Sequence, residues 1–165
     1  MRALVCSTIA LLLTAAWPAV HAQDQHAHDV SGGEALVSQL QFNEGRQWPT
    51  DATLRESMAR IRKTFDADHP AIHAGRETDT GYTKLATQLE KQVNAMVASC
   101  HLAPDVDAQF HYIVADLLQG ASWMRGADGA RTRHEGAALV HGALTAYGKY
   151  FDDPSWRPEP AMKEP

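Results

Sequence analysis

Four side chains of this protein carry the donor atoms that soft transition metals and haem iron prefer. Met58 and Met96 supply thioether sulfur, Cys100 a thiol and His111 an imidazole. Such groups bind copper, and a thioether and an imidazole are also axial ligands of haem iron. The residue types therefore predict a redox metal centre, with Met58 and His111 binding a cofactor and with Met58, Cys100 and His111 as ligands of a bound ion. The structural alternative is that the methionines and Cys100 only fill a core.

The sequence places the other histidines less favourably for metal or haem binding. His69 and His73 are four residues apart, but Pro70 stands between them and predicts a helix end near His69–Pro70. We therefore expect a solvated loop there, with a metal clip as the alternative. His141 lies on the flank of an apolar stripe, and His134 is expected at the surface.

The elements that must position these residues are helices, because apolar residues recur at helical spacing in four stretches. Their expected limits are Thr50 or Asp51 to His69–Pro70, Asp79 or Thr80 to Cys100, Pro104–Asp105 to Gly126, and a last stretch that ends before Pro154. Short connections force neighbouring helices to be antiparallel. We predict an all-α, up-down-up-down antiparallel four-helix bundle over residues 50–153, with Met58, Cys100 and His111 towards one end.

The ends of the chain predict export. Residues 1–22 combine Arg2, an apolar run and the small residues of a cleavage site, which is typical of a signal peptide. The mature protein is then expected in the periplasm, with a flexible arm and lead-in at 23–49 and a Pro-rich tail at 154–165. An uncleaved N-terminal anchor is the alternative. No later apolar run predicts a membrane span.

Composition and missing motifs exclude several functions. The formal net charge is −5 and basic residues form no stripe, so a nucleic-acid partner is not expected. The sequence contains no H-E-x-x-H zinc-protease motif, no G-x-S-x-G elbow and no phosphate-binding glycine loop. We predict a protein that is not an enzyme.

Three stretches resemble the cytochrome b562 family of periplasmic four-helix haem proteins. TLRESMARIRK resembles that family's first helix, AQFHYIVADLLQGA its third and TAYGKYF its last, together covering about residues 50–151. The resemblance implies haem b, with Met58 at the position of the axial methionine. The family's axial histidine would follow Tyr147, where this chain has Gly148. His111 or His141 would then have to bind the iron, or a copper ion would replace the haem.

The sequence therefore predicts an exported, non-catalytic bundle that holds haem b or copper, for electron transfer or metal handling. The alternative is a metal-free periplasmic adaptor or chaperone-like bundle that binds another protein.

Overall fold

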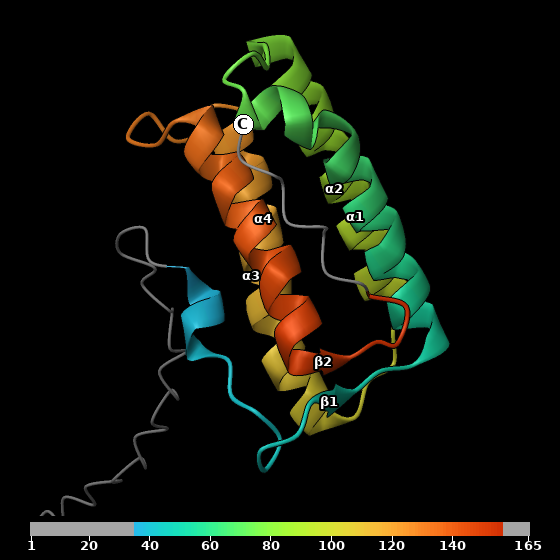
Figure 1. Cartoon of the computed structure of the whole chain (residues 1–165). Helices are drawn as coiled ribbons and strands as arrows, with labels where there is room; N and C mark the ends of the chain where they lie inside the picture. The colour runs from blue at the N-terminus through green and yellow to red at the C-terminus, as the bar shows by residue number, and fades with distance from the viewer. Residues whose placement is uncertain (1–34, 157–165) are drawn as a thin grey trace, which may run out of the picture. The chain divides into compact units, whose positions relative to one another are not determined.

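A computed structural model describes residues 35–156, and four α-helices make up most of that range. They are α1 (Ala52–His73), α2 (Asp79–Ser99), α3 (Pro104–Met124) and α4 (Arg133–Tyr150) (Figure 1). A short 3-10 helix, η1 (Leu36–Gln39), precedes them, and the strands β1 (Trp48–Pro49) and β2 (Phe151–Asp152) pair in parallel. The prediction of an all-α protein is confirmed for this range. The expected signal peptide lies outside the described residues.

The helices begin where the sequence provides caps. Asp51 at α1 and Thr78 at α2 each accept a hydrogen bond from a backbone N–H in the first turn. Pro104 stands at the start of α3, where its missing N–H costs nothing. Thr132 and Glu135 form a reciprocal capping box at α4. Each cap satisfies a donor that the helix itself leaves without an acceptor.

The first helix continues beyond the proline that was expected to end it. Pro70 lies inside α1, which runs to His73, so the predicted end near His69–Pro70 is wrong. Proline removes only one intrahelical donor, and buried Ile72 holds the next turn in the core. Beyond the C-cap Ala74, Gly75 terminates the helix: its φ of 63° is left-handed, and its N–H donates to Ile72 O at 3.0 Å. His69 and His73 are therefore one turn apart on a single helix.

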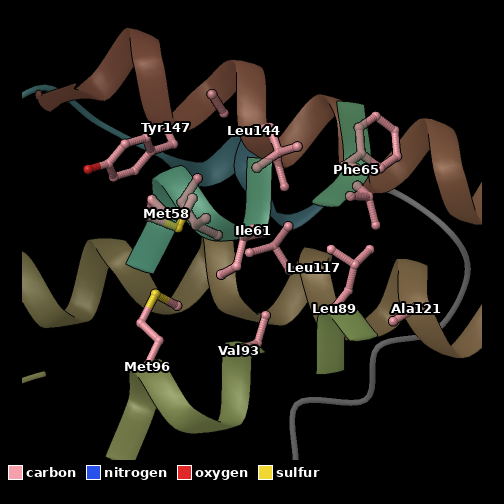
Figure 2. Close-up of a cluster of buried hydrophobic side chains, with 14 of the residues drawn as sticks. Met58, Ile61, Phe65, Leu89, Val93, Met96, Leu117, Ala121, Leu144 and Tyr147 are labelled. Atoms are coloured by element: carbon pink, nitrogen blue, oxygen red, sulfur yellow. The ribbon is translucent and has the colours of Figure 1, made fainter. Parts of the chain in front are cut away.

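The apolar stripes of all four helices meet in one core. Along the chain each helix packs against the next, and α1 also contacts α4, though less extensively than any sequential pair. Figure 2 shows part of this core, including Met58 and Phe65 from α1, Met96 from α2 and Tyr147 from α4. Its largest fully buried side chains are Tyr147, Phe65, Phe151, Leu54, Met58, Ile61, Leu85, Leu89, Met96, Ile113, Leu117 and Met124.

Two glycines allow α3 and α4 to pack in close contact. A Cβ added at Gly120 would lie 2.6 Å from the backbone oxygen of Gly136, and the reverse distance from Gly136 to the Gly120 oxygen is also 2.6 Å. Neither position accepts a side chain unless the helices separate. The two glycines therefore determine how α4 lies against α3.

A buried carboxylate fixes the segment that precedes the helices. Asp116 on α3 is only 2% exposed, and its two oxygens accept hydrogen bonds from Leu36 N at 3.0 Å and Val37 N at 2.9 Å. Burial raises the pKa of Asp116, and the two backbone hydrogen bonds oppose that rise. The N-terminal end of η1 is thus attached to the middle of α3.

Replacing Asp116 by Ala should release η1. The change leaves two backbone N–H groups without their acceptor, which costs about 1–3 kcal/mol of unfolding free energy. Urea denaturation measures the loss, and hydrogen exchange should accelerate at Leu36 and Val37. Asp105→Ala, an exposed position on the same helix, is the control and should leave exchange at η1 unchanged. Slow exchange at both amides in Asp116→Ala would show that other contacts hold η1.

Candidate functional site

Met58 lies in the filled core. Its side chain is 0% exposed, and Figure 2 shows it close to Tyr147 and Ile61. Met96 is 1% exposed in the same apolar cluster. Both thioethers are therefore surrounded by hydrocarbon and aromatic groups, which is the environment of packing residues.

His111 lies on the outside of α3. Its side chain is 71% exposed, and Nδ1 is 2.8 Å from the backbone oxygen of Asp107, one turn earlier. The expectation that His111 faces the interior beside Met58 is wrong. The inward face of α3 is centred on Phe110 and Leu117, and the 100° step from Phe110 to His111 leads away from that face. The structure does not bring Met58 and His111 together.

Cys100 ends α2 and is half-buried. Burial raises the pKa of its thiol, and the carboxylates of Asp51 and Asp107 raise it further. Both causes disfavour the thiolate, which is the form that binds metals and acts as a nucleophile.

The space beside Gly148 is occupied by the chain itself. A Cβ at Gly148 would lie 2.4 Å from Cδ1 and Nε1 of Trp156, a residue expected in the tail. The indole also packs edge-on against Tyr147, with ring centroids 4.7 Å apart, and Arg62 lies over it at 4.8 Å. An axial ligand here would have to displace Trp156. The residues around Met58 and Gly148 therefore do not fit haem b, nor a copper ion in its place.

A buried hydrogen bond secures this end of α4. The hydroxyl of Tyr147, fully buried, donates to Oδ2 of Asp153 at 3.1 Å, and Oδ1 of Asp153 accepts from the backbone N–H and the hydroxyl of Ser155. Burial raises the pKa of Tyr147 strongly, and the carboxylate of Asp153 raises it further. The phenol consequently stays protonated in the folded protein.

Two histidines from different helices meet across α1 and α4. The imidazole rings of His69 and His141 have centroids 4.9 Å apart and an interplanar angle of 21°. His69 is half-buried and His141 exposed, and both lie against Phe65. His73 lies one turn beyond His69, with ring centroids 6.2 Å apart. We call His69, His73 and His141 the histidine cluster.

The sequence could have suggested this cluster only in part. The four-residue spacing of His69 and His73 was visible, but Pro70 favoured a loop. His141 is 72 positions further along the chain from His69, so its proximity depends on how α1 packs against α4. Within residues 35–156, no three His, Cys, Asp or Glu side chains are already arranged to hold an ion.

In the described part of the chain, no helix combines the length and apolar character that crossing a bilayer requires. The chain matches no protein-family model, no curated protein and no solved structure. The resemblance to cytochrome b562 thus stays a prediction.

Replacing Gly148 by Ala should destabilise the protein. The added methyl group must push Trp156 off Tyr147, and overpacking of this kind costs about 1–3 kcal/mol. Gly142→Ala is the matched control, because nothing lies within 4 Å of its Cβ position on the same helix. That variant should be stabilised by about 0.5–1 kcal/mol through helix propensity. Thermal and urea unfolding compare the two, and equal stabilisation by both changes would mean that Trp156 does not cover Gly148.

Tyr147 should make the fold sensitive to alkali. Its folded pKa lies above the unfolded value of about 10, so its contribution to stability is fully present below that pH and is lost as pH rises beyond it. In Tyr147→Phe, the fall of unfolding free energy above pH 10 should be shallower by up to about 1.4 kcal/mol per pH unit. The same variant should be less stable at neutral pH, because the hydrogen bond to Asp153 is lost. An unchanged slope in Tyr147→Phe would contradict the assignment.

Proposed function

We propose that this chain is an exported, non-catalytic protein that binds a divalent transition-metal ion between α1 and α4 and serves in metal handling. The observation that carries the proposal is the pairing of His69 with His141 across two helices.

The spacing of the two rings suits a shared ion. Metal–nitrogen bonds to imidazole are about 2.0–2.1 Å long, and the ring centroid lies roughly 1.1 Å beyond the nitrogen. Two imidazoles bound at roughly 90–110° therefore have centroids about 4.5–5.2 Å apart, and the observed separation is 4.9 Å. The rings are nearly parallel, so binding requires the exposed His141 ring to turn about its Cβ–Cγ bond. Each imidazole has two nitrogens, so one can bind the ion while the other keeps a hydrogen bond.

The ligand type selects the metal. Imidazole donors suit Cu²⁺, Ni²⁺ and Zn²⁺, whereas Cu⁺ prefers the thiolate and thioether groups that are protonated or buried here. Among divalent ions, Cu²⁺ should bind most tightly, following the usual order of stability. An exposed imidazole site of this kind supports ion capture and release more than electron transfer.

An up-down-up-down bundle is the arrangement that we propose for the helices. Cross-helix contacts support it: Gln92 of α2 donates to Thr64 of α1, and Arg125, which directly follows α3, pairs with Glu90 of α2. The connections between helices, 74–78, 100–103 and 125–132, are short, which favours antiparallel neighbours. In this arrangement, His69 in the second half of α1 lies opposite His141 in the middle of α4.

Export to the periplasm remains part of the proposal. It rests on Arg2, the apolar run after it and the small residues near position 22.

A metal-free adaptor is the second candidate, and an exposed aromatic group favours it. Phe42 is 43% exposed and lies on Tyr150, with ring centroids 4.7 Å apart, while Lys149 covers the Tyr150 ring at 4.9 Å. Exposed aromatic residues beside a cation are common anchors at protein interfaces.

Metal titration tests the proposed function. Residues 23–165 carrying His26→Ala and His28→Ala, which remove the imidazoles of the N-terminal arm, are titrated with Cu²⁺, Ni²⁺ and Zn²⁺ by calorimetry. One ion should bind, and His69→Ala or His141→Ala should weaken Cu²⁺ binding at least about tenfold, or 1.4 kcal/mol. His134→Ala, an exposed histidine of α4, is the matched control and should bind as before. Binding unaffected by both His69→Ala and His141→Ala would remove the site, and no binding at all would favour the adaptor.

A further inference from the structure

The continuation of α1 through Pro70 places a third imidazole beside the proposed ion. His69 and His73 project from one helix at a spacing of four residues, which puts side chains on the same face. The His69 ring contacts both of the others: its centroid lies 4.9 Å from that of His141 and 6.2 Å from that of His73, with an angle of 58° to the latter. The three rings thus form a chain centred on His69.

We propose that His73 is the third ligand of the ion, so that the histidine cluster becomes a three-nitrogen site. The inference rests on the proposed function, because it adds a ligand to the same ion. Two imidazoles of a helix, four residues apart, bind one ion in known zinc sites. Three imidazoles with one further position open is a common protein site for zinc.

The ring separations show that the side chain of His73 has to move for all three imidazoles to bind one ion. The His69–His141 separation already fits a common ion, whereas the His69–His73 separation exceeds the range of about 4.5–5.2 Å by about 1 Å. His73 is exposed, so a rotamer change moves its ring without disturbing the core. Binding of the third imidazole therefore requires His73 to turn towards the ion and towards His141 as well.

A local consequence follows for the end of α1. Pro70 has no N–H, so the carbonyl of Asp66 lacks its helical partner at the point that the His69–His73 pair spans. An ion bound to both histidines links the turns on either side of Pro70. The last turn of α1 should therefore open less often when the metal is bound.

The ligand count of bound Cu²⁺ tests the inference. The chain with His26→Ala and His28→Ala is loaded with one equivalent of Cu²⁺, and the nitrogen hyperfine pattern of its electron paramagnetic resonance spectrum is recorded. Three nitrogen ligands are expected, and two in His73→Ala, with an affinity about tenfold lower. His73→Gln repeats the test with a polar side chain of good helix propensity, and His134→Ala should keep three nitrogens.

Hydrogen exchange gives a readout that does not depend on the ligand count. Cu²⁺ should slow exchange at residues 71–76 in the starting chain and in His134→Ala, but not in His73→Ala. Two nitrogens in the starting chain, together with equal affinity in His73→Ala, would overturn the role of His73 and leave the His69–His141 site intact. If the chain with His26→Ala and His28→Ala binds no Cu²⁺, both proposals are overturned.

Discussion

The contact between Gly120 and Gly136 determines how the helices share the core. The backbone oxygens of Gly136 and Gly120 lie 2.6 Å from the position that a Cβ would take on the facing helix, so α3 and α4 meet in close contact. A helix held this close to one neighbour has less of its surface available to the other, and α4 packs much less extensively against α1. A row of rings joins α1 to α4 beside the aliphatic side chains of the core, such as Ile61 and Leu144 (Figure 2). Phe65 and His69 contribute from α1, and His141 from α4.

The two ends of that row differ in chemistry. Towards the C-terminal end of α4, Trp156 covers Gly148 and Tyr147, and Arg62 of α1 lies over the indole. The buried Tyr147–Asp153 hydrogen bond holds this end in place. Towards the other end, the row consists of imidazoles that are half-buried or exposed. The indole of Trp156 thus occupies the space beside Gly148, and the imidazole of His141 lies seven residues earlier on α4.

The proposed metal site would connect ion binding with tertiary stability. An ion bound to His69 and His141 adds a link between the pair of neighbouring helices that contact each other least. Any ligand that binds only the folded state raises the free energy of unfolding in proportion to the logarithm of its concentration.

The sequence by itself determined the four helices, because apolar periodicity and caps such as Asp51 and Thr132 are local signals. It also identified Met58 and Met96 as stripe residues, which they are. It did not determine the end of α1, since Pro70 disfavours helix locally and only the burial of Ile72 and the left-handed Gly75 outweigh it. It also failed to predict that His111 points outward. His111 lies on the flank of a stripe, and such a residue turns in or out according to how the helix is rotated against its neighbours. The tertiary structure alone decided that Trp156 fills the space at Gly148, and that His141 lies beside His69. Both contacts join residues on different elements, and their formation depends on helix packing, which no local pattern records.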